Sequence, residues 1–190
     1  MNKKLATALS GGAVLMLVLS GCGGDDGAKK ADAWAKKVCD AWQPELKKIE
    51  AANGDIKRVA TESSKPEEVQ STDSAAFGTM SASYQSMGTA LKEAGVPPVK
   101  DGAATSAEAV KGFESTSKGY ADLKAKMDAL DPKDQTKFAE GLKELAGGLE
   151  EATKGGKDAL AQLNAGGLDK AMNSQKGCQV TAPSTSPSPK

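Results

Sequence analysis

Histidine is absent from this chain of 190 residues, and Arg58 is the only arginine among its 25 basic residues. Without histidine, the commonest general base and metal ligand are missing, which excludes catalytic triads and zinc proteases of the usual kind. The planar guanidinium of arginine is well suited to binding phosphates and base edges of nucleic acids, and the chain has almost none. Its 25 basic residues are also balanced by 25 acidic ones, so the chain has no net positive charge. We therefore predict no nucleic-acid partner.

The sequence also lacks signs of β-structure, because no segment alternates β-branched and polar residues as strands do. A phosphate-binding loop that follows a strand is thereby excluded. Pairs of acidic residues occur at the starts of predicted helices or among lysines, where helix capping and solvation explain them: Glu67, Glu68, Asp131, Asp134, Glu150 and Glu151. We predict an all-α protein that is not an enzyme and holds no cofactor.

The chain has one long apolar run, at residues 13–19, and it is too short to cross about 30 Å of hydrocarbon as a helix. Lys3 and Lys4 precede it, so residues 1–21 read as a signal peptide. The four residues that end it, Leu19, Ser20, Gly21 and Cys22, resemble a lipobox, in which the cysteine is acylated and becomes the first residue.

Lipidation of Cys22 would place the protein on the outer face of the cytoplasmic membrane, since two or three acyl chains anchor stably where one does not. Residues 22–29 are rich in glycine and aspartate and are expected to form a flexible tether. Residues 179–190 are rich in serine, threonine and proline and are expected to be a disordered tail. The predicted folded domain is residues 30–178.

Two further cysteines, Cys39 and Cys178, lie near the two ends of that domain. In an exported protein this placement predicts a disulfide that joins the N-terminal and C-terminal ends. The alternative is a two-thiol metal or redox site, which neither a CxxC spacing nor a histidine supports.

Apolar residues at helical spacing predict an antiparallel four-helix bundle with helices at about residues 30–52, 65–94, 104–130 and 132–163. Pro44 is expected to kink or divide the first helix, while Ser64 and Asp131 are expected to cap the second and fourth. A short last turn should lead to Cys178. The predicted core consists of Trp42, Phe77, Tyr84, Phe113, Tyr120, Phe138, Leu142, Leu145 and Leu149.

Glycines recur at intervals of seven in the last two predicted helices: Gly112, Gly119, Gly141, Gly148 and Gly155. Each glycine lowers helix stability by about 1 kcal/mol relative to alanine, so we expect the repeated glycines to serve a structural purpose. Close packing of the two helices is one explanation, a groove left open for a partner helix is a second, and local fraying is a third.

Methionines offer one alternative metal site. Met80 and Met87 lie one heptad apart, and Met127 occupies the matching stripe of the third helix. Three converging thioethers could bind Cu(I), although methionine is also ordinary core filler.

Taken together, the lipobox, the early "VCDAW", the lysine-rich helices and the late "KGCQ" resemble the small secreted lipoproteins of high-GC Gram-positive bacteria. That resemblance implies no substrate and no catalytic residue. We expect a non-catalytic module anchored to the membrane that binds an envelope protein or a wall component. The alternative is a carrier of a lipid, a metabolite or Cu(I), with its site between Tyr84, Met87 and Tyr120.

Overall fold

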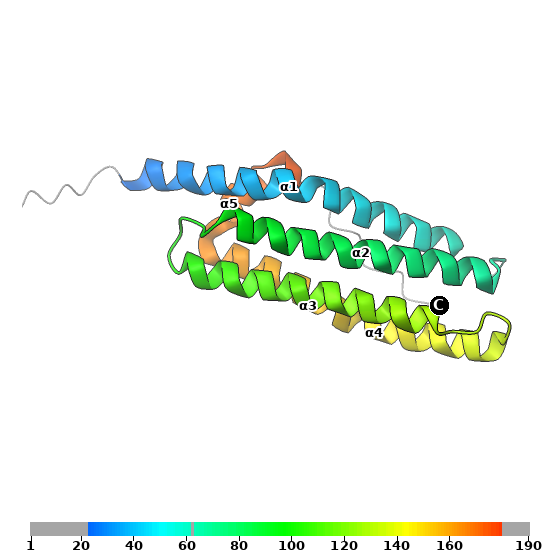
Figure 1. Cartoon of the computed structure of the whole chain (residues 1–190). Helices are drawn as coiled ribbons and strands as arrows, with labels where there is room; N and C mark the ends of the chain where they lie inside the picture. Colours follow the sequence, from blue (N-terminus) through cyan, green and yellow to red (C-terminus); the bar gives the residue numbers. More distant parts are fainter. Residues whose placement is uncertain (1–22, 62, 180–190) are drawn as a thin grey trace, which may run out of the picture.

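The computed structural model describes residues 23–61 and 63–179, and its four long helices run alternately up and down (Figure 1). They are α1 (Gly23–Val59), α2 (Pro66–Ala94), α3 (Gly102–Asp128) and α4 (Gln135–Leu163). The chain then continues through a π-helical turn, η1 (Asn164–Leu168), the short helix α5 (Asp169–Asn173) and a 3₁₀ turn, η2 (Lys176–Cys178). The predicted antiparallel four-helix bundle is confirmed.

Helix α1 is longer than predicted at both ends. It already includes residues 23–29, which we expected to form a flexible tether, and its first turns extend past the α2–α3 loop (Figure 1). Extension is cheap because each residue added to an existing helix makes one further hydrogen bond. The helix also continues through Pro44 without dividing. Pro44 is exposed, so water can hydrogen-bond the Asp40 carbonyl that the proline leaves without a partner.

The caps of α2 and α4 differ from those predicted. The N-cap of α2 is Lys65, which makes no capping hydrogen bond with its side chain, and the Ser64 hydroxyl lies 2.7 Å from the Thr61 hydroxyl. The N-cap of α4 is Asp134, whose carboxylate accepts a hydrogen bond of 3.1 Å from the Lys137 backbone N–H. Asp131 instead accepts from the Lys133 N–H.

The helices pack in sequential order: α1 on α2, α2 on α3, and α3 on α4. Helices α1 and α4, which would complete a closed bundle, do not pack closely on one another. Six of the nine predicted core residues are buried, whereas Tyr84, Leu142 and Leu149 are half-buried. Leu142 and Leu149 both lie on α4.

The interior forms two clusters along the bundle axis. The first, which we call the disulfide cluster, draws on all four helices and the C-terminal turns, and includes Trp34, Val38, Cys39, Trp42, Leu91, Phe113, Leu163 and Leu168. The second, the distal cluster, includes Ala52, Phe77, Met80, Tyr120, Leu123, Met127 and Leu145. Helix α1 gives the first cluster two tryptophans, but its only fully buried residue in the second is an alanine.

A disulfide links Cys39 of α1 to Cys178 of η2, with Cα atoms 5.0 Å apart, as predicted. The chain can return to α1 because Gly167, in η1, adopts a φ of 86°, in the left-handed region that glycine tolerates best. Gly177 then lies against the Cys39 carbonyl so closely that a Cβ would overlap it. Both η2 and α5 pack on α1 near the disulfide (Figure 1).

Candidate functional site

Five aromatic side chains form a continuous stack through the middle of the bundle. The Trp42 ring meets the Phe113 ring edge-on, with the ring centroids 5.1 Å apart, and the centroids of Phe113 and Tyr84 are 6.1 Å apart. Tyr84 stacks on Tyr120 at 5.7 Å, and Tyr120 lies 6.2 Å from Phe77. Burial raises the pKa of both tyrosines, and in Tyr120 the neighbouring Tyr84 adds to the effect.

The stack occupies the interior position at which a carrier would need its cavity. Tyr84 and Tyr120 face each other at an interplanar angle of 7°, so the two rings fill the space between α2 and α3 at this level. Neither ring lines the two grooves described below. The carrier alternative would therefore require the stack to separate before a ligand could enter.

The three methionines considered for Cu(I) are all buried, but they lie in different parts of the interior. Met80 and Met127 belong to the distal cluster, whereas Met87 belongs to the disulfide cluster. Trp42 fixes α1 near Met87 by donating its indole N–H to the Met87 carbonyl oxygen at 3.0 Å. The three methionines are therefore divided between two clusters of the core.

The glycines lie in the contact between α3 and α4. A Cβ at Gly112 would overlap the carbonyl oxygen of Gly155, and a Cβ at Gly119 would meet the backbone of Ala152. Gly141 packs against Leu130, and Gly148 against Leu123, in the same seam. The first of the three explanations therefore holds, and no open groove for a partner runs along these glycines.

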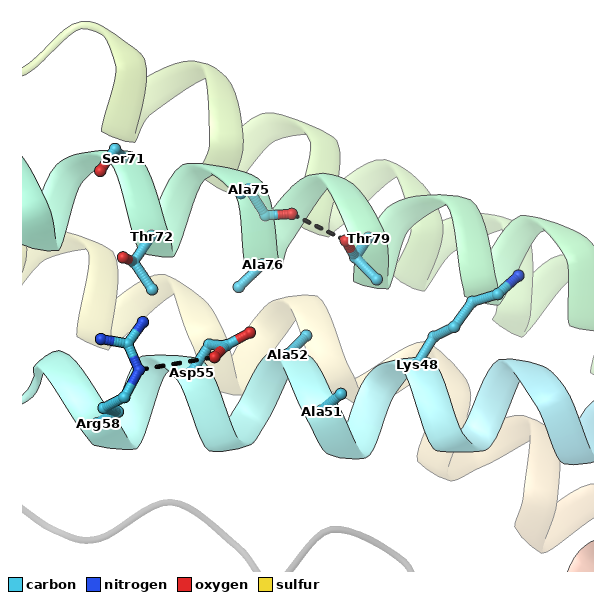
Figure 2. A pocket seen from close by; sticks show the side chains of 10 residues that line it. All are labelled: Lys48, Ala51, Ala52, Asp55, Arg58, Ser71, Thr72, Ala75, Ala76 and Thr79. Carbon is cyan, nitrogen blue, oxygen red and sulfur yellow. Dashed lines mark hydrogen bonds and ion pairs between the residues drawn. The ribbon is translucent and has the colours of Figure 1, made fainter.

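A shallow groove of about 450 Å³ lies instead between α1 and α2 (Figure 2). Its floor consists of alanines, of which Ala52 and Ala76 are buried. Short side chains leave the groove open because they cannot fill the space between the two helix axes. The rim carries Lys48, Asp55 and Arg58 from α1 and three hydroxyl residues, Ser71, Thr72 and Thr79, from α2.

Charged groups on the rim are already paired within the protein. Arg58 lies 3.8 Å from Asp55 and 3.3 Å from Glu68, and Lys48 lies 2.8 Å from Glu45. A second groove of about 390 Å³ continues along the same two helices, lined by Ala41, Gln85, Ser86, Thr89, Ala90 and Glu93. The first groove therefore presents small uncharged groups between paired charges.

Asp73 is a half-buried acid that the sequence alone did not single out. It stands on the inner stripe of α2, four residues before Phe77, and its Oδ1 atom is buried without a hydrogen-bond partner in the described residues. Burial raises the pKa of this carboxyl to about 6. The signal was available, because residue 73 continues the apolar spacing of Phe77, Met80 and Tyr84.

Within the described ranges, no three histidine, cysteine, aspartate or glutamate side chains gather in an arrangement that could hold a metal ion. No helix in those ranges has an apolar stretch long enough to cross a bilayer. Cys22, the signal peptide and all but the first residue of the predicted tail lie outside the described residues. Comparison of the chain with protein-family models, curated proteins and solved structures found no match in any of the three.

Proposed function

We propose that this chain is a non-catalytic binding module of the cell envelope, anchored at the outer face of the cytoplasmic membrane through acyl chains on Cys22. Its resemblance to small secreted lipoproteins of high-GC Gram-positive bacteria supports the anchor and the location. Helix α1 begins at Gly23, directly after the proposed anchor, so it would carry the bundle away from the membrane.

The observation that carries the binding role is the uncharged outer face of α2. Charged residues make up 26% of the chain, yet between Glu68 and Lys92 this helix has only one, Asp73, which belongs to its inner stripe. Its exposed positions there are Ser71, Ala75, Ala82, Gln85, Ser86 and Thr89. The centres of protein interfaces are depleted of charge because burying an unpaired charge is costly.

We infer that this face, together with the two α1–α2 grooves, contacts another envelope protein through an uncharged surface. Small side chains let a partner approach the α2 backbone closely, and the grooves add depth beside it. Catalysis would need a second reactive group beside the lone interior carboxyl of Asp73. The chain offers no histidine for that role.

Cross-linking in intact cells followed by mass spectrometry tests the proposal. Ala82→Glu places a charge in the middle of the uncharged face, and Ala121→Glu places the same charge on an exposed position of α3. A specific envelope protein should be captured by wild type and by Ala121→Glu and lost in Ala82→Glu. Capture that Ala82→Glu leaves unchanged contradicts the proposed face, and a co-purifying lipid or metabolite without any protein favours the carrier alternative.

The anchor is tested separately by metabolic labelling with an alkynyl fatty acid. Wild type should be labelled and Cys22→Ala should not, because the cysteine thiol is the proposed acylation site. Equal labelling of both proteins would contradict the anchor while leaving the binding face untouched.

A further inference from the structure

The loop between α2 and α3 displays an apolar side chain to solvent. Two large apolar side chains are exposed in the described residues, Val96 in this loop at 65% and Leu160 on α4 at 41%. Residues 95–99 of the loop carry no charge, and Pro98 is exposed beside Val96. A loop tip of this kind gains free energy when an apolar environment covers it.

The loop presents Val96 on a fixed backbone. Trp34 of α1 donates its indole N–H to the Gly95 carbonyl oxygen at 2.9 Å. On the other side of Val96, Pro97 is fully buried, and its carbonyl oxygen accepts a hydrogen bond of 2.9 Å from the Val99 N–H. Because both neighbours of Val96 are already fixed, covering its side chain costs little conformational entropy.

This loop lies at the same end of the bundle as the proposed lipid anchor. Figure 1 shows that α1 begins beyond the α2–α3 loop, and the hydrogen bond from Trp34 marks the level at which the two meet. The eleven-residue step from Gly23 to Trp34 corresponds to about 16 Å of helix. Acyl chains on Cys22, which precedes Gly23, would therefore bring the loop within about 20 Å of the bilayer.

We propose that the α2–α3 loop is a second membrane contact, in which Val96 and Pro98 enter the surface of the bilayer that holds Cys22. The proposal rests on the lipid anchor of the proposed function. The loop needs little affinity of its own, because attachment through Cys22 makes the second contact intramolecular and raises the effective concentration of lipid around it. To make this contact, α1 leans toward the bilayer on the side of α2.

Apolar contact, more than charge, drives this interaction. Lys100 and Asp101 at the end of the loop have opposite signs. On the last turn of α2, Lys92 pairs with Glu114 of α3 at 2.6 Å, and the acidic Glu93 follows it. Attraction to anionic headgroups requires an excess of basic groups, which these residues do not supply. The contact should therefore form on zwitterionic and on anionic membranes alike.

Photo-cross-linking of the lipidated protein in vesicles tests the second contact. The vesicles contain phosphatidylcholine and a lipid with a diazirine in the upper part of its acyl chain, with or without phosphatidylglycerol. Trypsin releases the α2–α3 loop in residues 93–100, and the α3–α4 loop at the opposite end of the bundle in residues 127–133 (Figure 1). Residues 93–100 should carry at least about five times as much cross-linked lipid, because only their apolar tip enters the bilayer.

Two variants compare the two exposed apolar side chains. Val96→Ser should lower the cross-linking of residues 93–100 at least about fivefold, since burial of a valine side chain no longer contributes. Leu160→Ser is the matched control and should leave the cross-linking unchanged, because α4 packs on α3 and does not pack closely on α1. Equal cross-linking of the two loops in wild type, or cross-linking that Val96→Ser does not lower, overturns the proposal.

Failure of this contact can be separated from failure of the anchor, because fatty-acid labelling tests the anchor without involving the loop. If labelling contradicts the anchor, the chain from Cys22 onward is coupled through the Cys22 thiol to a maleimide lipid, and the two loops are compared again. Cross-linking confined to residues 93–100 then supports the affinity of the loop for a bilayer, whereas equal cross-linking of both loops overturns it.

Discussion

The α3–α4 seam and the α1–α2 seam join their helices in opposite ways. Between α3 and α4, glycines bring the backbones together, and the Gly156 N–H donates a hydrogen bond of 2.6 Å to the buried Thr116 hydroxyl. Between α1 and α2, alanines line parts of two open grooves. On α2, the buried Ser83 hydroxyl has no hydrogen-bond partner in the described residues.

Helix α1 is also the helix that carries the disulfide. Among the long helices α1 packs closely on α2 alone, and Cys39 joins it to the C-terminal turn η2. This comparison of the two seams indicates that the bundle holds its helices together in two ways. Close packing secures α3 and α4, and a covalent bond compensates for the open α1–α2 seam and for the lack of close packing between α1 and α4.

The largest expected effect comes from removing the covalent link. Replacing Cys39 and Cys178 together by serine should lower the free energy of unfolding by about 4 kcal/mol, because the closed loop of 139 residues no longer restricts the unfolded chain. Urea unfolding of this variant measures the change, with Cys22→Ser as the control that keeps the pair. A midpoint equal to that of the control would show that packing alone holds α1.

A methyl group placed in the α3–α4 seam should have the next largest effect. Gly112→Ala would force apart the backbones of α3 and α4 and should cost about 2 kcal/mol. Gly147→Ala, whose added carbon meets open space, should instead stabilise the protein by about 0.5–1 kcal/mol. Thermal unfolding of the two variants should shift in opposite directions, and shifts of the same sign would contradict the tight seam.

The two buried hydroxyls, one with a hydrogen-bond partner and one without, provide a matched comparison. Thr116→Val removes the acceptor of the Gly156 N–H and should cost about 1–2 kcal/mol. Ser83→Ala removes a buried hydroxyl that makes no hydrogen bond in the described structure, so stability should stay within about 0.5 kcal/mol of wild type or rise. Chemical denaturation of both variants tests this, and a larger loss for Ser83→Ala would reverse the comparison.

The smallest effect concerns the seam between α2 and α3, where the Asp128 carboxylate accepts hydrogen bonds from both helices. Hydrogen bonds from Lys124 and Ser74 lower the pKa of Asp128 below its usual value. The stabilisation by Asp128 is therefore complete when the pH is above the usual pKa of an aspartate, and it is lost as the pH falls through the lowered pKa. Asp73, whose pKa is raised, has the opposite pH dependence. Titration followed by magnetic resonance should show the Asp128 pKa rising in Ser74→Ala, and an unchanged midpoint would remove Ser74 from the explanation.

Much of the fold could be predicted because its signals are local or periodic. The 3,4 spacing of Phe77, Met80 and Tyr84 indicated both a helix and its inner face. Two cysteines at the ends of the domain left one pairing for a disulfide. The ends of α1 were predicted less well. Residues 23–29 contain glycines and charged residues, which do not predict a helix, yet they extend a helix that has already formed in the residues after them.

The candidate site was predicted poorly, because it depends on which helices become neighbours. Glycine spacing in α4 allowed either a packed seam or an open groove, and only the position of Gly155 against Gly112 decided between them. Asp73 was overlooked because a single acid within an apolar stripe does not reveal whether a neighbouring helix supplies a partner. The grooves arise from short side chains on two separate helices, so neither helix alone predicts them.

The sequence by itself determined the helical class, the inner face of each long helix and the disulfide, because hydrophobic periodicity and cysteine placement are properties of the chain alone. Tertiary structure decided which helices lie close together, that Met87 is separated from Met80 and Met127, and that α1 leaves its grooves open. The physical reason is that burial, desolvation and close approach depend on surfaces from distant segments, whose mutual fit is fixed only when the bundle assembles.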